Sequence, residues 1–441
     1  MPRNYAGTRD WFGEESSRRR FIIDRVIRVF REFGYEELET PIIELADTLR
    51  GKYGEEGNST MYLFGKSGDN IGLRYDQTVP LARVAAQFSN DLVFPYRRFA
   101  IGPVFRADKP QAGRYRQFTQ MDFDILGVDS VLADAEVVAI LYRVAYSLGF
   151  RDFRVLVSDR DLLTGMAKSI GARNKDQILT AIRGWDKLVK VGVEQVLEEI
   201  SSVSLSTEAF RETTENLLSM NGDCRDVVES LRNMFTDNAT VKKGINRLSN
   251  LIELVDTMEV PQINWRIAPT LARGLEYYTG PIFEVEAGQG IGSIAGGGRY
   301  DSLIQTLGGP SITGTGASFG LERVYTVMEQ LGLFPDQVGQ LDVFVTVFMP
   351  ELLDASVRVA TQLRSAGFKV EVNMTEDRLG AQLKLADRRK ARFALVIGPD
   401  EVRNGTISIK RLRLSKGGTT KNQVSVPESQ LVDTLQQFEG E

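Results

Sequence analysis

The stretch GPVFRADKPQAGRYRQFTQMDFDILG, residues 102–127, decides the fold of this chain. An apolar run leads to Arg106, a segment rich in proline and glycine follows, and a second run alternates apolar and polar residues. The alternation places Gln120, Asp122 and Asp124 at every second position, so we expect their side chains on one face of a β-strand. Arginine cations, an aromatic ring and strand-borne carboxylates favour a nucleotide together with a small cationic or amine-bearing substrate.

Size and composition point to a soluble protein of more than one domain. The chain has 441 residues, of which 42% are hydrophobic and 26% charged, and this length predicts two or three domains. No apolar run approaches a membrane span, and the N-terminal residues lack an apolar signal core. The lone Cys224 cannot form an internal disulfide, which favours a cytoplasmic location.

The chain contains no histidine, which limits the chemistry available to it. Imidazole is excluded as a general base or metal ligand, and with a single cysteine no structural zinc site is expected. Any catalysis must therefore use arginines, carboxylates, hydroxyls and a carboxylate-bound ion such as Mg²⁺.

Elements outside the opening stretch follow from apolar spacing. Over the first 160 residues, this spacing predicts a helix at 14–33, a strand at 36–45, a helix at 132–149 and a strand at 152–159. A polar helical region follows over 165–258, and it includes a single amphipathic helix over 185–200. Further strands are expected at 281–287 and 292–295. The glycine cluster 296–301 then either turns a tight corner or brings backbone close to a substrate.

The last hundred residues read as a separate α/β unit. A linker over 330–340 precedes the strand 341–348, the helix 351–366, the strand 368–373, the helix 376–390 and the strand 392–397. Lys and Arg greatly outnumber Asp and Glu over 378–421, although the net charge of the whole chain is −5. This excess suits RNA phosphates, but a solvated helix face and a charged hairpin remain an equal alternative.

Several of these segments resemble one family. Residues 102–127 resemble motif 2 of a class II aminoacyl-tRNA synthetase, and RGLEYYTG at 273–280 resembles histidyl-tRNA synthetases specifically. The resemblance extends from GTRD at 7–10 to the C-terminal unit, and LRYDQTVP at 73–80 resembles the eukaryotic and archaeal branch. It implies an α+β fold, with a class II antiparallel sheet flanked by helices, an inserted helical domain and a C-terminal α/β anticodon-binding domain.

The family's organisation implies domain boundaries and partners. The catalytic domain would occupy 1–164 and 259–329, the helical domain 165–258, the linker 330–340 and the anticodon-binding domain 341–441. The helix–strand–proline unit at the start (motif 1) would build a homodimer interface. The helical domain would lie against the tRNA acceptor arm, although a passive spacer is the alternative.

The resemblance also assigns site residues. For ATP, Arg106 and Arg273 would contact the α-phosphate, Arg114 the outer phosphates, and Phe118 and Arg323 the two faces of adenine. Singly, each arginine also fits a surface ion pair.

The amino-acid pocket would share some of these groups. Asp76, Thr78 and Gln120 would hold the α-amino group, and Asp124 the ring N–H. Tyr277 and Tyr278 would wall the imidazole, although each alone also suits a core. Arg106 and Arg273 would complete the histidine-binding set. In the motif 2 loop, Lys109 and Gln111 match positions that meet the tRNA acceptor end, while loop exposure alone makes them solvent-facing.

These assignments imply a histidine–tRNA ligase that uses ATP and Mg²⁺. Its partners would be L-histidine, tRNA(His) and a second copy of the chain, with no membrane involved. The main alternative is a non-catalytic paralogue that acts as a histidine-sensing regulatory subunit. A stress-sensing module related to the family is a weaker alternative.

Overall fold

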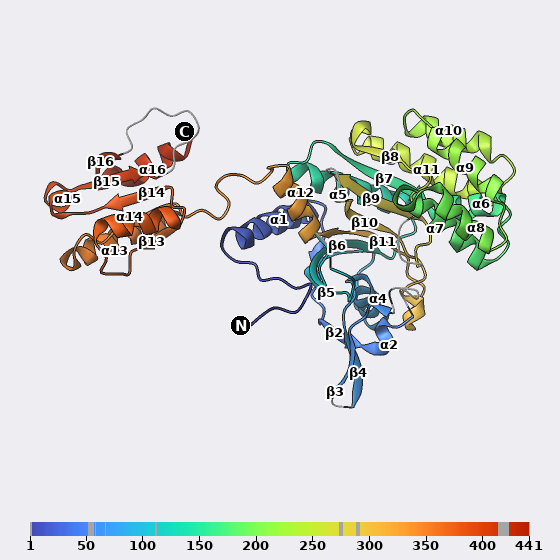
Figure 1. Cartoon of the computed structure of the whole chain (residues 1–441), viewed down its shortest axis with the longest axis horizontal. Coiled ribbons are helices and arrows are strands. Elements are labelled where there is room, and N and C mark those ends of the chain that lie inside the picture. Colours follow the sequence, from blue (N-terminus) through green and yellow to red (C-terminus); the bar gives the residue numbers. More distant parts are fainter. Residues whose placement is uncertain are drawn as a thin grey trace. The chain divides into compact units, whose positions relative to one another are not determined.

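The computed structural model describes residues 2–51, 57, 59–66, 68–110, 113–272, 277–287, 292–412 and 423–440. The chain forms two compact units (Figure 1). The larger comprises Met1–Trp11 and Arg18–Phe334, and the smaller comprises Phe12–Ser17 and Pro335–Glu441. Within the described ranges, no helix is both long enough and apolar enough to cross a membrane.

The larger unit is built on an eight-stranded sheet. Most neighbouring strands are antiparallel, and only the pairs at the two edges, β1 with β5 and β7 with β8, are parallel. In spatial order the strands are β1 (Glu36–Glu37), β5 (Tyr96–Phe105), β6 (Gln117–Leu126), β11 (Gly314–Gly320), β10 (Ser293–Arg299), β9 (Pro281–Ala287), β7 (Phe153–Asp159) and β8 (Trp265–Ile267).

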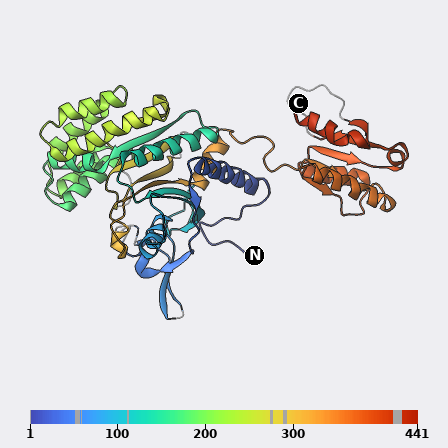
Figure 2. The same ribbon diagram turned by 180° about the vertical axis from the view of Figure 1, so that it is seen from behind.

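Alternation along the central strands gives the sheet one apolar and one polar face. Buried Phe99, Met121 and Phe123 belong to a core that also takes in the apolar sides of three helices. These are α1 (Gly13–Glu32), α5 (Val131–Ser147) and α12 (Leu321–Gln330), which lie on the same side of the sheet in both views (Figures 1 and 2). The other face, which carries the acidic residues of β6, is left for the site.

A small sheet and a short helix lie beside the polar face. The sheet has the order β2-β4-β3, with β2 at Ile43–Leu45, β4 at Asp69–Leu73 and β3 at Leu63–Lys66. Helix α4 (Thr78–Gln87) follows β4. The single strand predicted over 36–45 is wrong, because β1 joins the large sheet and β2 the small one; Pro41, which has no N–H to donate to a ladder, lies between them.

Six helices follow β7, as the helical pattern predicted. They are α6 (Arg160–Ser169), α7 (Lys175–Val191), α8 (Val193–Ser202), α9 (Thr207–Ser219), α10 (Cys224–Met234) and α11 (Ala239–Thr257). The single helix predicted over 185–200 is wrong. It is divided at Gly192, whose φ of 81° is left-handed and therefore ends α7 at a position that favours glycine.

The glycine cluster forms strand rather than turn. Strand β10 runs straight through Gly296, Gly297 and Gly298, so the predicted end of the strand at residue 295 is wrong. A Cβ atom on Gly297 would lie 2.1 Å from the carbonyl oxygen of Gly316 on β11. The glycines are therefore needed for close packing within the sheet.

The smaller unit confirms the predicted alternation of strands and helices. Its five-stranded sheet has the order β13-β12-β14-β15-β16, parallel up to β14 and antiparallel beyond it. The strands are β12 (Val343–Val345), β13 (Val370–Val372), β14 (Phe393–Val396), β15 (Thr406–Arg411) and β16 (Gln423–Pro427). The helices are α13 (Leu353–Ser365), α14 (Leu379–Arg388), α15 (Pro399–Asn404) and α16 (Leu431–Gly440).

Candidate active site

The site lies on the polar face of the sheet, where small residues flank the acidic residues of β6. Asp122 pairs across the strands with Ala100 of β5 and Ser318 of β11. Asp124, two residues further along, pairs with Arg98 and Gly316. The predicted sharing of one strand face is confirmed by this register.

Asp124 is held by two protein groups. Its Oδ1 accepts a hydrogen bond of 2.5 Å from the Tyr300 hydroxyl, and its Oδ2 lies 2.8 Å from Nη2 of Arg98. All three side chains are buried. Burial raises the pKa of Asp124, while Arg98 and the Tyr300 hydroxyl lower it. The carboxylate that the resemblance assigns to a ring N–H is therefore already oriented by the protein.

Asp76 lies two residues before the start of helix α4 at Thr78. Its Oδ1 accepts the backbone N–H groups of Thr78, at 3.1 Å, and Val79, at 3.0 Å. Gln77 then donates its Nε2 to the carbonyl oxygens of Ala100, at 3.2 Å, and Gln120, at 3.0 Å. These bonds bring the predicted amino-group residues against β5 and β6.

Gln120 and Asp122 are joined through Ser318. Nε2 of Gln120 donates to Oγ of Ser318 at 3.1 Å, and Ser318 also makes a hydrogen bond with Asp122. Burial, as the largest cause, raises the pKa of Asp122 to about 7, with Asp124 and Asp76 adding to the rise and Arg98 and Ser318 opposing it.

Arg106 and Phe118 come together where β5 ends and β6 begins. The guanidinium carbon of Arg106 lies 4.3 Å from the ring centroid of Tyr75 and 5.2 Å from that of Phe118. Its Nε donates to the carbonyl oxygen of Tyr75 at 3.1 Å. The guanidinium group of Arg106 therefore lies beside the aromatic ring of Phe118, and this arrangement is suitable for binding a nucleotide.

Helix α12 ties Arg323 to the same region. Nη1 of Arg323 donates to the carbonyl oxygen of Ser293 at 2.9 Å. The preceding residue, Glu322, accepts the backbone N–H of Thr119 at 2.9 Å and Nη1 of Arg19 at 2.7 Å. Glu322 and Arg19 had no role in the sequence interpretation, because no local sequence pattern indicates which groups these two side chains contact.

Three tyrosines form a cluster at the Asp124 end. Tyr277 and Tyr278 meet edge to face with centroids 5.2 Å apart, and Tyr277 meets Tyr300 at 6.0 Å. A Cβ atom on Gly298 would lie 2.8 Å from the Tyr278 ring, so the glycine makes room for it. Sequence reasoning missed Tyr300, although its place in the GGGRYD cluster was the available signal.

The remaining predicted residues are less constrained. Lys109 and Arg114 are exposed in the segment between β5 and β6. Arg273 and Gln111 lie outside the described residues. Within the described ranges, no three Asp, Glu or Cys side chains lie close enough together to hold a metal ion.

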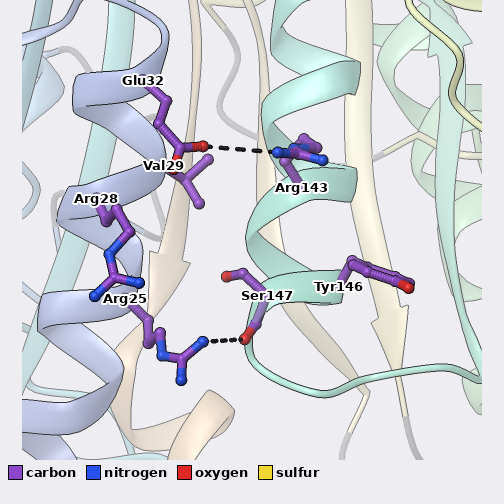
Figure 3. A pocket seen from close by; sticks show the side chains of 7 residues that line it. All are labelled: Arg25, Arg28, Val29, Glu32, Arg143, Tyr146 and Ser147. Carbon is purple, nitrogen blue, oxygen red and sulfur yellow. Dashed lines mark hydrogen bonds and ion pairs between the residues drawn. The ribbon is translucent and has the colours of Figure 1, made fainter.

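A separate pocket of about 220 Å³ lies between α1 and α5. Figure 3 shows its side chains, among them Arg25, Arg28 and Arg143. Arg143 pairs with Glu32 at 3.7 Å, and Nη1 of Arg25 donates to the Ser147 carbonyl at 3.4 Å. Both helices cover the apolar face of the sheet, so this pocket is separate from the site above.

An antiparallel sheet whose strands β5 and β6 carry the motif 2 segment is the fold of a class II aminoacyl-tRNA synthetase. The family model for histidyl-tRNA synthetase matches residues 7–324, and that for the anticodon-binding domain matches residues 342–438. The chain belongs to the histidyl-tRNA synthetase family.

Curated relatives and a solved structure agree with this placement. Histidine–tRNA ligase of Cytophaga hutchinsonii is 36% identical over 435 residues, covering 92% of this chain and 94% of that protein. The same enzyme of Gloeobacter violaceus is 35% identical and covers 96% and 95%. The crystal structure of histidyl-tRNA synthetase from Nostoc sp. PCC 7120 has a TM-score of 0.86 at 29% identity, with 99% of each chain covered. These relatives are bacterial and do not support the predicted placement in the eukaryotic and archaeal branch.

Proposed function

We propose that this chain is a histidine–tRNA ligase. In the first step the carboxylate of L-histidine attacks the α-phosphorus of ATP, which yields histidyl-adenylate and releases pyrophosphate. In the second step a terminal ribose hydroxyl of tRNA(His) attacks the carbonyl carbon and AMP leaves. The proposal rests on one observation. The chain matches the family model for histidyl-tRNA synthetase over residues 7–324, and residues 342–438 match the family model for the anticodon-binding domain.

The first step needs positioning and positive charge more than proton transfer. The attacking carboxylate is already ionised, so a site without imidazole is sufficient. We assign Arg106 to the α-phosphate and the histidine carboxylate, and Phe118 and Arg323 to the two faces of adenine. Guanidinium groups suit this task because they are always charged and can bind two oxygens at once. We assign Arg273 to the α-phosphate and Arg114 to the outer phosphates.

The amino-acid pocket combines the acidic strand face with the tyrosine cluster. Asp124, oriented by Tyr300 and Arg98, would accept the ring N–H, and Tyr277 and Tyr278 would enclose the imidazole. A buried acceptor for a ring N–H discriminates against side chains that lack the donor by roughly 10⁴ in favourable cases.

The α-amino group would lie at the other end of this pocket. There we assign Asp76, Thr78 and Gln120, which the bonds of Gln77 bring against β5 and β6. The segment LRYDQTVP at 73–80, which contains Asp76, was the feature that suggested the eukaryotic and archaeal branch. We treat Asp76 as a feature of the amino-acid pocket and not as a sign of descent from that branch.

Mg²⁺ would come with the nucleotide. Mg²⁺ commonly binds through substrate phosphates with one or two carboxylates. Within the described residues no group of three or more Asp, Glu or Cys side chains could hold a metal ion, and we place the ion on the substrate phosphates. The ion would neutralise phosphate charge, and no step is assigned to a protein-held metal.

The tRNA and a second copy of the chain are the expected macromolecular partners. We assign Lys109 and Gln111 to the acceptor end and the unit beyond Pro335 to the anticodon. The segments 1–164 with 259–329, 165–258, 330–340 and 341–441 are proposed as the domains. Ile43, Leu45 and Phe64 on the small sheet, and Ile42 just before β2, are exposed, and we propose them as apolar contacts of a homodimer. We propose a cytoplasmic location.

Histidine-dependent ATP–pyrophosphate exchange tests the activity directly. We expect exchange with L-histidine only, and charging of tRNA(His) in the complete reaction. Arg273→Ala should reduce exchange by about 10²-fold or more if its charge acts on the α-phosphate. Binding of histidine without exchange would favour the non-catalytic, histidine-sensing alternative.

A further inference from the structure

Asp122 is a buried carboxylate that the assignments above do not use. It is 2% exposed and lies between Gln120 and Asp124 on the site face of β6. Its Oδ1 has no hydrogen-bond donor among the described residues. A buried carboxylate oxygen without a donor is costly, so its retention needs an explanation.

A second acceptor without a donor lies next to it on the same face. Oε1 of Gln120 likewise finds no partner within the described ranges, although Nε2 of the same amide is bonded to Ser318. Two positions along a strand span about 7 Å, so one small group can bridge the two side chains. Because Ser318 bonds both side chains, it fixes them in one arrangement.

The charges around Asp122 call for a cation. From β6 it faces Asp124, from the start of α4 Asp76, from β5 Arg98, and from the end of β4 Arg74. Ser318, its neighbour on β11, is uncharged. All of these ionisable groups are buried, and among the described residues the three carboxylates outnumber the two guanidinium groups.

We propose that Asp122 is an additional substrate contact, whose Oδ1 accepts a hydrogen bond from the α-ammonium group of the bound amino acid together with Oε1 of Gln120. An ammonium group supplies three donors and one positive charge, which are what these two acceptors lack. The proposal rests on the proposed function, because it takes an amino acid as the substrate. It adds a second carboxylate, beside that of Asp76, at the amino end of the pocket.

Binding of the ammonium group would then be linked to ionisation of Asp122. Burial holds part of this carboxyl in the protonated form near neutral pH. An arriving cation favours the ionised form, so the proton is released to solvent. Affinity for histidine should therefore rise with pH up to about 7 and level off above it.

Asp122→Asn tests the contact with little change of shape. Calorimetric binding is measured for L-histidine and for 3-(imidazol-4-yl)propanoate, which keeps the ring and the carboxylate but lacks the ammonium group. We expect histidine to bind about 10- to 100-fold more weakly, as for loss of a charged hydrogen bond, and the analogue to be unaffected. Equal weakening of both ligands, or no weakening of histidine, would overturn the proposal.

Proton release gives a second and independent measurement. At pH 7, wild-type protein should release more protons on histidine binding than Asp122→Asn does, as measured in buffers of different ionisation enthalpy. Equal release would contradict the proposal. The matched control is Asp91→Asn, at an exposed aspartate, which should leave both measurements unchanged. If Asp122→Asn fails to fold, Asp122→Ser is compared in the same way.

Failure of the inference is distinguishable from failure of the proposed function. Wild-type protein that neither binds histidine nor supports exchange would remove the function itself. Wild-type protein that does both, with an Asp122 variant that does not separate the two ligands, would remove only the role of Asp122.

Discussion

At the scale of single residues, the site depends on buried carboxylates whose charge is controlled by a few hydroxyls and guanidinium groups. Asp124 has Tyr300 and Arg98, whereas Asp122 has one hydrogen bond from Ser318 and an oxygen without a described donor. Two carboxylates on one strand therefore differ in how firmly the protein holds them. This difference leads to two predictions.

Tyr300→Phe should weaken histidine binding more than ATP binding. The hydroxyl lowers the pKa of Asp124, so its removal makes the carboxyl easier to protonate and less able to accept an N–H. We expect KM for histidine to increase about 10-fold or more, and KM for ATP to stay unchanged, in pyrophosphate exchange. Tyr146→Phe, at an exposed tyrosine of α5, is the control. Equal increases in both constants would argue against a role specific to the ring pocket.

Asp122→Asn should stabilise the unliganded protein at neutral pH. Folding raises the pKa of this acid from 3.8 to about 7, so the wild-type fold loses stability as pH rises through that window. The loss reaches about 4 kcal/mol above pH 7, at 1.36 kcal/mol per pKa unit. Asn cannot ionise, so Tm of the variant should exceed that of wild type at pH 7.5 and approach it at pH 4. A variant less stable than wild type at pH 7.5 would contradict this account.

At the scale of elements, the join between α12 and β6 positions the nucleotide residues. Glu322 ties the start of α12 to the backbone of Thr119, next to Phe118, and its neighbour Arg323 bonds β10. The Glu322 side chain therefore fixes the distance between Phe118 and Arg323, which we assign to the two faces of adenine.

Glu322→Gln should raise KM for ATP more than KM for histidine. The amide keeps a hydrogen bond to one partner but loses the charge that pairs with Arg19 at 2.7 Å. We expect a loss of about 1.5–3 kcal/mol in stability, as for buried bonds to charged groups. Thermal unfolding and exchange kinetics measure the two effects. Glu329→Gln, at a half-exposed pair on the same helix, should change neither by a comparable amount.

Prediction from sequence worked where the signal is local and failed where it is not. The two-residue period in β6 placed Gln120, Asp122 and Asp124 correctly, because alternation is a property of the strand itself. For the cluster Gly296–Gly298 the sequence left a tight turn and a close approach to substrate as alternatives, since glycine has no side chain to show alternation. Only pairing with β9 and β11 makes it a strand. At Gly192 the apolar stripe continues into the next helix, so periodicity did not show the break.

Partners distant in sequence explain what was missed in the site. Tyr300 and Arg98 meet Asp124 from other parts of the chain, and Glu322 meets Arg19 at the far end of the sequence. The family resemblance supplied the motif residues, while their supporting contacts required coordinates.

At the scale of the whole molecule, the two units have separate cores. Apolar residues of the smaller unit, such as Val343 and Leu395, form a cluster distinct from the core beneath the large sheet. A chain that ends at Phe334 should therefore fold and keep histidine-dependent exchange. Its kcat/KM for charging of tRNA(His) should fall by at least about 10-fold, because the proposed anticodon contacts are removed. Unchanged charging by the shortened chain would show that the smaller unit has no part in tRNA recognition.

The pocket that we assign to histidine has walls of aspartate, tyrosine and glycine, and the chain itself contains no imidazole. Every imidazole resonance in a proton NMR spectrum of the complex would therefore come from the ligand. The ionisation state and tautomer of bound histidine can be followed through a full pH titration without isotope labels, which histidine-containing enzymes do not permit.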